Sequence, residues 1–152
     1  MINGVVVKEL VTNHDNRGFF REVIRASDDF FKEGFGQWSH SLMLNGVIKA
    51  WHMHRVQTDW WYVPSGVLRM GLCDMRPESS TYKKTMELLL GDYQPARLVK
   101  VPPGVAHGGQ TIQGPVHLLY ITSHLYNPKD EIRIPYNDPS IDFNWLSPSE
   151  IK

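Results

Sequence analysis

The feature of this sequence that most restricts its fold is the regular alternation of short apolar runs with turn residues. Gly, Pro, Asn or Asp interrupts the apolar runs roughly every 8 to 12 residues along most of the chain. That spacing is typical of antiparallel sandwiches and barrels, so we predict an all-β fold. The predicted strands cover residues 5–10, 18–24, 37–44, 47–52, 60–64, 67–73, 85–90, 98–101 and 116–122.

Two segments depart from the strand pattern. The stretch "SDDFFK" at residues 27–32 is predicted to be a short helix, because Ser27 can cap it, acidic residues follow, and Gly34 ends it. From "NPKDEIRIPYNDPS" onward the chain is rich in turns and proline, which predicts a peripheral C-terminal tail packed on the barrel. No repeat or linker divides the sequence, so residues 1–152 are expected to form a single domain.

Composition excludes several classes of partner. Acidic and basic residues balance at 16 each without a basic block, which argues against nucleic acid or an anionic membrane as the main partner. The opening "MINGVVVKEL" lacks the pattern of a secretory signal, and no apolar run reaches the roughly 20 residues of a membrane helix. Cys73 is the only cysteine, so we expect a cytoplasmic protein without an internal disulfide.

The stretch "GVIKAWHMHRVQTDWWYVPSG", residues 46–66, carries the candidate functional residues. His52 and His54 are two positions apart, so in a strand their side chains point to the same face. Asp59 follows, and a later segment, "VPPGVAH", supplies His107. Three imidazoles and a carboxylate would suit a divalent transition metal such as Fe, Mn, Ni or Zn. Proton transfer, or simple packing of the histidines in the barrel, remains an alternative from the residues alone.

These segments resemble the paired motifs of the cupin superfamily, G-x5-H-x-H-x4-E-x6-G followed by P-x-G-x2-H. Asp59 stands where cupins usually have glutamate, and the second motif lacks its upstream glycine and trailing asparagine. The resemblance implies a cupin jelly-roll barrel.

Six segments resemble one branch of the cupins, the dTDP-4-dehydrorhamnose 3,5-epimerases, in order from about residue 4 to residue 150. They are "DNRGFFREV" at 15–23, "GVIKAWH" at 46–52, "CDMRPESSTY" at 73–82, "VPPGVAHG" at 101–108, "LLYITSHLYNPKDE" at 118–131 and "YNDPSIDFNW" at 136–145. The resemblance implies a homodimeric isomerase that uses no metal or other cofactor. Its substrate would be a nucleoside-diphosphate 4-keto-6-deoxy sugar. A base removes a proton beside the ketone, donors hold the enolate, and an acid returns a proton from the opposite face.

The resemblance also implies roles for residues of the barrel. His52 would be the base and Tyr120 the acid, although Tyr120 could instead be a core aromatic. Lys49 and His107 would hold the developing oxyanion, and His107 could also fix the tautomer of His52. Glu150, in "LSPSE", matches the aspartate that pairs with the base histidine in the family. Such a carboxylate would raise the basicity of the imidazole.

The remaining expected contacts are to the substrate. Arg17 and Glu22 match positions that contact the nucleotide in the family, and Arg17 would pair with the diphosphate. Gln57 and Tyr126 complete the expected substrate-binding set.

The sequence departs from the family at three positions. Family members typically carry glutamine at the position of His54, lysine at Asp59 and aspartate at Met70. Exchanging lysine for aspartate reverses a charge near the sugar or diphosphate, so a non-standard substrate is expected. Two alternatives follow from these changes. One is a metal-dependent cupin enzyme that uses His52, His54, Asp59 and His107, and the other is a non-catalytic cupin that binds a sugar nucleotide.

Overall fold

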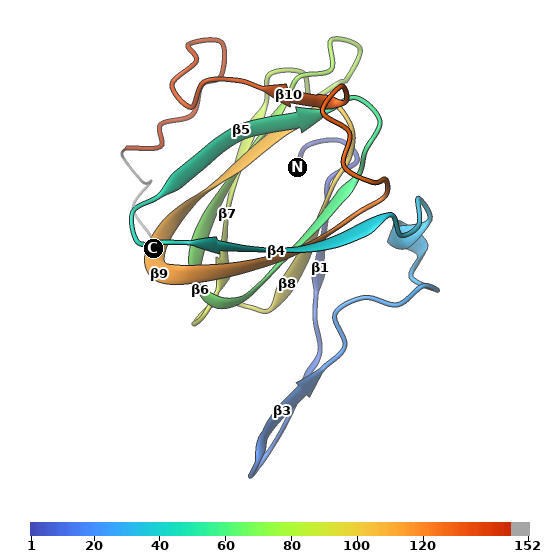
Figure 1. Ribbon diagram of the computed structural model, residues 1–152, viewed down its shortest axis with the longest axis vertical. Helices are drawn as coiled ribbons and strands as arrows, with labels where there is room; N and C mark the ends of the chain where they lie inside the picture. Colours follow the sequence, from blue (N-terminus) through green and yellow to red (C-terminus); the bar gives the residue numbers. More distant parts are fainter. Residues whose placement is uncertain (147–152) are drawn as a thin grey trace.

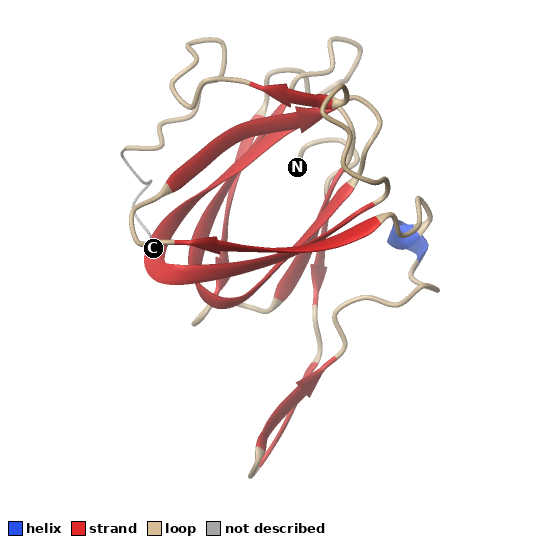
Figure 2. Ribbon diagram, in the orientation of Figure 1, coloured by secondary structure: helices blue, strands red, loops and turns tan. Residues whose placement is uncertain are grey.

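The computed structural model describes residues 1–146, which are mostly strands and loops with one turn of 3-10 helix, η1 (Asp29–Phe31) (Figure 2). Each of the strands in the described residues pairs with at least one other strand, always antiparallel. They are β1 (Val6–Glu9), β2 (Thr12–Asp15), β3 (Gly18–Arg21), β4 (Gln37–Met43), β5 (Ile48–His54), β6 (Asp59–Asp74), β7 (Thr85–Gly91), β8 (Arg97–Val101), β9 (Val105–Thr122) and β10 (Glu131–Arg133).

Two long strands, β6 and β9, pair with each other and run through both layers of the sandwich (Figure 1). In one layer, the first part of β6 pairs with β8 and with the end of β9, and β4 pairs with the other side of β9. In the other layer, the second part of β6 pairs with β7 and with the beginning of β9. There β5 pairs with β9, and β10 pairs with β5. This is the all-β jelly-roll sandwich that the sequence predicts, so the predicted fold class is confirmed.

The strand β6 bends near Ser65, where its pairing with β9 shifts register. Gly66 has φ +81°, and a Cβ atom there would lie 2.6 Å from the carbonyl oxygen of Pro115. The chain therefore needs glycine to turn from one layer into the other. The predicted strands 60–64 and 67–73 are consequently one strand, because Pro64 and Gly66 lie at a bend and do not end it.

The main core fills the space between the two layers. It contains Leu68, Met70, Leu72 and Val99, none of which is measurably exposed. Met70 therefore belongs to the packing of the sandwich, which explains how an apolar side chain is accommodated at this departure from the family.

Two smaller apolar clusters cover the outer faces of the sandwich. Trp51 packs against Trp145 and Phe143, so the described part of the predicted C-terminal tail lies on the barrel at these residues. On the other side Phe31 of η1 packs edge-on against Trp60, with ring centroids 4.7 Å apart. Helix η1 is shorter than the predicted 27–32.

The predicted cap of η1 is wrong, because Asp28 takes the N-cap position. Its carboxylate makes no cap hydrogen bond; it accepts one hydrogen bond from Lys8 Nζ at 2.8 Å and one from the Arg25 backbone N–H at 2.9 Å, which together hold this turn.

The hairpin of β2 and β3 projects away from the barrel (Figure 1). The sequence analysis missed β2, whose residues "TNHD" carry little apolar signal. Phe19 and Phe20 of the hairpin are more than half exposed, at 58% and 64%. Within residues 1–146, no helix has the length and apolarity to cross a bilayer.

A candidate active site in the mouth of the barrel

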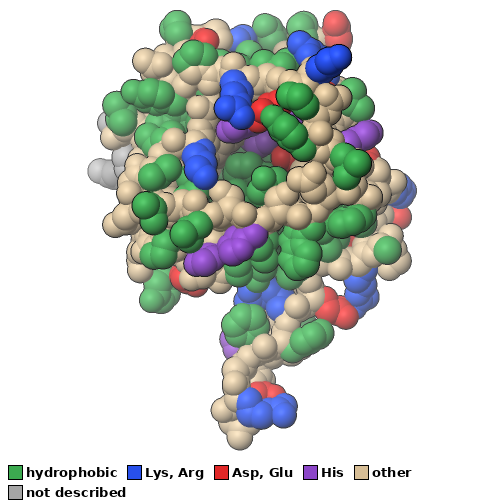
Figure 3. Space-filling view, in the orientation of Figure 1, with side chains coloured by type: hydrophobic (Ala, Val, Ile, Leu, Met, Phe, Trp, Pro, Cys, Tyr) green, Lys and Arg blue, Asp and Glu red, His purple; other side chains and the backbone are tan. Residues whose placement is uncertain are grey.

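A pocket of about 350 Å³ opens between β4, β5 and β9. In Figure 3 it is a hollow with histidine and acidic side chains inside and basic side chains beside it. Its wall brings together most of the residues expected at the site, namely Lys49, His52, Gln57, His107, Tyr120 and Tyr126.

Three expected site residues are not part of this pocket. Arg17 lies at the turn of the projecting hairpin, where it pairs with Asp15 at 2.6 Å. Glu22 pairs with Arg25 just beyond the hairpin. Glu150 lies outside the residues that the structure describes.

The alternation of β5 sorts its side chains as predicted. His52 and His54 face the pocket, while Met53 packs in the outer cluster with Trp51. The Nδ1 atom of His52 lies 2.8 Å from Oε1 of Glu131, which the pairing of β10 with β5 brings alongside.

The carboxylate of Glu131 is nearly buried, with 13% of its side chain exposed. Burial alone would raise its pKa, but hydrogen bonds from His52 and Arg133 outweigh burial, and the pKa is lowered. Glu131 is therefore an anion that accepts the Nδ1 proton of His52 and leaves Nε2 as the basic nitrogen.

Sequence reasoning missed Glu131 because it lies in the segment interpreted as a turn-rich tail. The signal that could have found it is the alternation of Glu131 and Arg133 around Ile132, the pattern of a short strand.

Tyr120 lies on β9, opposite Trp61 of β6 and Ser39 of β4. Its ring packs against the main core and also lines the pocket. Tyr120 is therefore both a core aromatic and a pocket residue, the two placements considered from the sequence. Two cations lie at the same pocket: Lys49, whose Nζ is 3.1 Å from Ser41 Oγ, and Arg133, which pairs with Glu131 at 3.1 Å. They suit an anionic substrate or a developing oxyanion.

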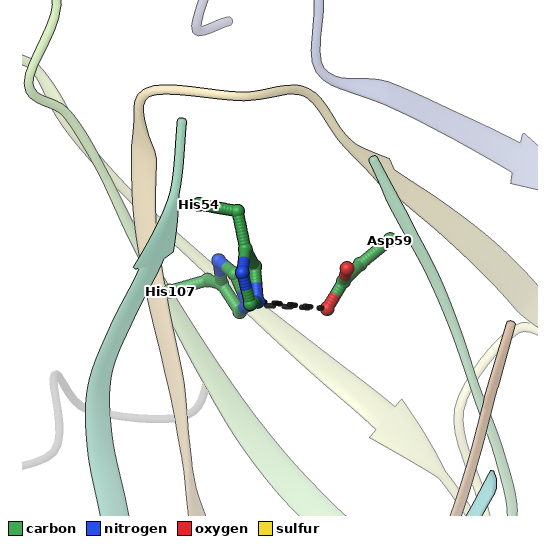
Figure 4. Close-up of side chains that lie close together, drawn as sticks. All are labelled: His54, Asp59 and His107. Carbon is green, nitrogen blue, oxygen red and sulfur yellow. Dashed lines mark ion pairs between the residues drawn. The ribbon is translucent and has the colours of Figure 1, made fainter. Parts of the chain in front are cut away.

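A second group of side chains, His54, Asp59 and His107, also lines the pocket (Figure 4). The Oδ2 atom of Asp59 lies 3.4 Å from His107 Nε2 and 4.0 Å from His54 Nε2. His52 pairs with Glu131 and is not one of this group, so the four-residue metal set expected from the cupin motifs divides into two parts.

The charges in this group are coupled. Burial acts to raise the pKa of Asp59, but the contact with His107 and the nearby His54 outweigh it, and the pKa is lowered. Burial lowers the pKa of His54, and His107 adds to that effect, while the nearby carboxylates oppose it. Asp59 is therefore an anion at neutral pH, and His54 is a neutral imidazole that can donate a lone pair.

Fold and pocket together define a cupin-type sandwich with a histidine–carboxylate pair and a tyrosine in one cavity. A family model described as dTDP-4-dehydrorhamnose 3,5-epimerase matches residues 1–152, and the chain belongs to that family. The family resemblance in the sequence is thereby confirmed.

Relatives and solved structures agree with this assignment. The spore coat polysaccharide biosynthesis protein SpsL of Bacillus subtilis is 43% identical over 95% of this chain and 97% of its own length. A dTDP sugar isomerase from Desulfovibrio desulfuricans has a TM-score of 0.88 at 27% identity, over 95% of this chain and 92% of that one. The dTDP-6-deoxy-D-glucose-3,5-epimerase of Legionella pneumophila, solved with dTDP-4-keto-L-rhamnose, has a TM-score of 0.85 at 25% identity, over 95% and 80%.

Proposed function

We propose that the protein epimerises a nucleoside-diphosphate 4-keto-6-deoxy sugar at C3, C5 or both, by proton transfer beside the ketone. The observation that carries this proposal is the His52–Glu131 pair, 2.8 Å apart, in a pocket that Tyr120 also lines. The side chains of the chain are sufficient for the proton transfers, so the epimerisation needs no redox or organic cofactor.

The reaction proceeds in two proton transfers. His52 Nε2 takes the proton from the carbon next to the ketone, and the electron pair of the broken C–H bond moves onto the ketone oxygen. Glu131 stabilises the imidazolium that forms, while the Lys49 ammonium stabilises the enolate oxygen. Tyr120 then gives its hydroxyl proton to the carbon from the other face, which inverts the centre. Solvent returns a proton to the phenolate and removes one from His52.

The rim of the pocket supports an anionic, diphosphate-linked substrate. Lys49 and Arg133 both line it, and relatives of this family bind dTDP sugars in their solved structures. The nucleobase and the sugar would be selected by Gln57, Tyr126 and other side chains of the pocket wall.

The active form would be a homodimer. Arg17 lies on a hairpin that projects away from the barrel of its own chain (Figure 1), which would place it near a nucleotide bound to a second copy. Exposed apolar side chains on β4, among them Trp38 at 66% and Leu42 at 51%, support a contact between copies.

Deuterium exchange tests the chemistry. A panel of nucleoside-diphosphate 4-keto-6-deoxy sugars is incubated with the protein in D₂O, and C3 and C5 are followed by NMR. Wild-type protein is expected to exchange and invert one or both centres, and His52→Asn to do neither. Tyr120→Phe should retain exchange by His52 while losing most of the inverted product, because the acid on the other face is gone. Binding without exchange on any substrate would favour the non-catalytic cupin.

A further inference from the structure

We propose that His54, Asp59 and His107 form a binding site for one divalent transition-metal ion at the inner part of the pocket. The three residues come from different strands, β5, β6 and β9, and one ligand atom of each lies within 4.8 Å of the others (Figure 4). Their side chains are 11%, 5% and 3% exposed, so a bound ion would be shielded from bulk water.

The contact between His107 and Asp59 suits a cation. Its Nδ1 lies 3.0 Å from the carbonyl oxygen of Val105, and because a carbonyl can only accept, Nδ1 carries the proton. The Nε2 atom lies 3.4 Å from Oδ2 of the buried Asp59 carboxylate, which also accepts from the Trp61 indole N–H at 3.4 Å. A cation at this contact would compensate the buried carboxylate charge.

His54 offers a second imidazole ligand. Its Nδ1 is buried without a hydrogen-bond partner and lies 3.6 Å from the carboxylate of Asp130. With the proton on Nδ1, facing Asp130, the Nε2 lone pair accepts from the Gln57 amide at 3.2 Å and lies 4.0 Å from Asp59, so a bound ion would take the place of that amide donor. Metal-bound histidines commonly have a carboxylate at the other nitrogen in this way. A divalent ion between the three residues would accept a lone pair from each of them.

The distances and ligand types fit a transition metal. Bonds of about 2.1 Å in a tetrahedron place ligand atoms about 3.4 Å apart. The His107–Asp59 separation of 3.4 Å has that value, while the contacts of His54, 4.0 Å to Asp59 and within 4.8 Å for the whole group, would shorten by side-chain rotation on binding. Two imidazoles and one carboxylate suit Zn²⁺, Fe²⁺, Co²⁺ or Ni²⁺, whereas Mg²⁺ and Ca²⁺ prefer oxygen ligands. Gln57 Nε2 donates to Asp59 Oδ1 at 2.7 Å and so orients the carboxylate.

The ion would have open coordination positions toward the pocket that His52 and Tyr120 line. If the proposed epimerase function is correct, the ion adds positive charge beside the sugar or its diphosphate. Metal binding itself does not rest on that function and is measured without substrate.

Titration of the tag-free, metal-depleted full-length protein with CoCl₂ tests the site by calorimetry and by the visible absorption of Co²⁺. We expect one equivalent to bind. His54→Gln and Asp59→Asn should each weaken binding by more than about 100-fold, the upper end of the penalty for losing an outer hydrogen-bond partner. The matched control is His40→Gln, which alters the exposed pair in which His40 Nε2 lies 2.9 Å from His117 Nδ1. It should bind Co²⁺ like the wild type.

Absence of Co²⁺ binding would overturn the site, and so would binding that survives both pocket variants or disappears in His40→Gln. Because a pocket variant could unfold the barrel, anomalous diffraction from wild-type crystals grown with Co²⁺ provides an independent measurement. A peak between the three residues is expected, and a peak elsewhere would refute the proposal. Deuterium exchange tests the epimerase function separately. Either proposal can therefore fail without deciding the other.

Discussion

At the scale of single residues, the pocket gives each of its histidines a separate carboxylate. Glu131 pairs with His52, Asp59 contacts His107, and Asp130 faces Nδ1 of His54. A carboxylate at one imidazole nitrogen determines what the other nitrogen can do. Neighbouring histidines can therefore act differently, as in the proposed roles of His52 as a base and of His54 and His107 as metal ligands.

Glu131→Gln should lower kcat by about 10- to 100-fold, the usual cost of losing an outer partner of a functional histidine. The amide keeps the size of the side chain but no longer stabilises the imidazolium of His52. Steady-state kinetics on an accepted substrate measures the effect, with Glu33→Gln as control because Glu33 pairs with Lys100 outside the pocket. An unchanged kcat would remove Glu131 from the mechanism.

The same variant has a pH signature in stability. Because the folded protein lowers the pKa of Glu131, its ionisation stabilises the fold above the ordinary glutamate pKa of 4.5. That contribution is lost as the pH falls through the lowered value. Denaturant unfolding should show the wild type more stable than Glu131→Gln at neutral pH, with the difference shrinking below about pH 4.

At the scale of elements, the pocket depends on β6 and β9 passing from one layer to the other. Gly66 makes the turn in β6 with φ +81°, tightly against Pro115. Asp59 stands at one end of β6 and the packed second half of the strand follows the bend. The position of Asp59 relative to His107 is therefore coupled to this turn.

Gly66→Ala should destabilise the fold by about 3 kcal/mol or more, because it combines a left-handed φ with a backbone clash. Gly46→Ala is the matched control, since Gly46 has φ +75° with nothing within 4 Å of an added Cβ. It should cost only about 1 to 2 kcal/mol, from the dihedral angle alone. Denaturant unfolding measures both, and equal losses would show that the contact with Pro115 is unimportant.

At the scale of the whole molecule, the β4 strand carries exposed apolar side chains and the hairpin of β2 and β3 projects from the barrel. Trp38, Leu42 and Leu44 are each more than half exposed, at 66%, 51% and 64%, along one side of β4 and its end. Several exposed apolar side chains on one face of a strand are typical of interfaces.

Trp38→Glu should convert the proposed dimer into a species of about 17.5 kDa, the mass of one chain. A charge placed in an apolar interface is costly to bury, so association weakens. Light scattering after gel filtration measures the mass. The control is Tyr93→Glu, because Tyr93 is 89% exposed in the turn between β7 and β8. A wild-type protein that is already monomeric would contradict the dimer.

The sequence by itself determined the all-β fold, the family and most of the pocket wall. Alternating apolar residues and turn residues are local signals, and the spacing of His52 and His54 fixes their shared face. Local signals gave the wrong prediction at Gly66, where a bend within β6 was interpreted as the end of a strand. They also missed β2, a polar strand that was interpreted as a loop.

Only the tertiary structure decided which charged groups meet. The pairing of β10 with β5 brings Glu131 to His52 across 79 positions of sequence, and the meeting of β5, β6 and β9 joins His54, Asp59 and His107 apart from His52. Such contacts depend on strand register and on the path of the long strands. Neither is encoded in the residues around each contact, since a shift of one position in register turns every side chain to the other face.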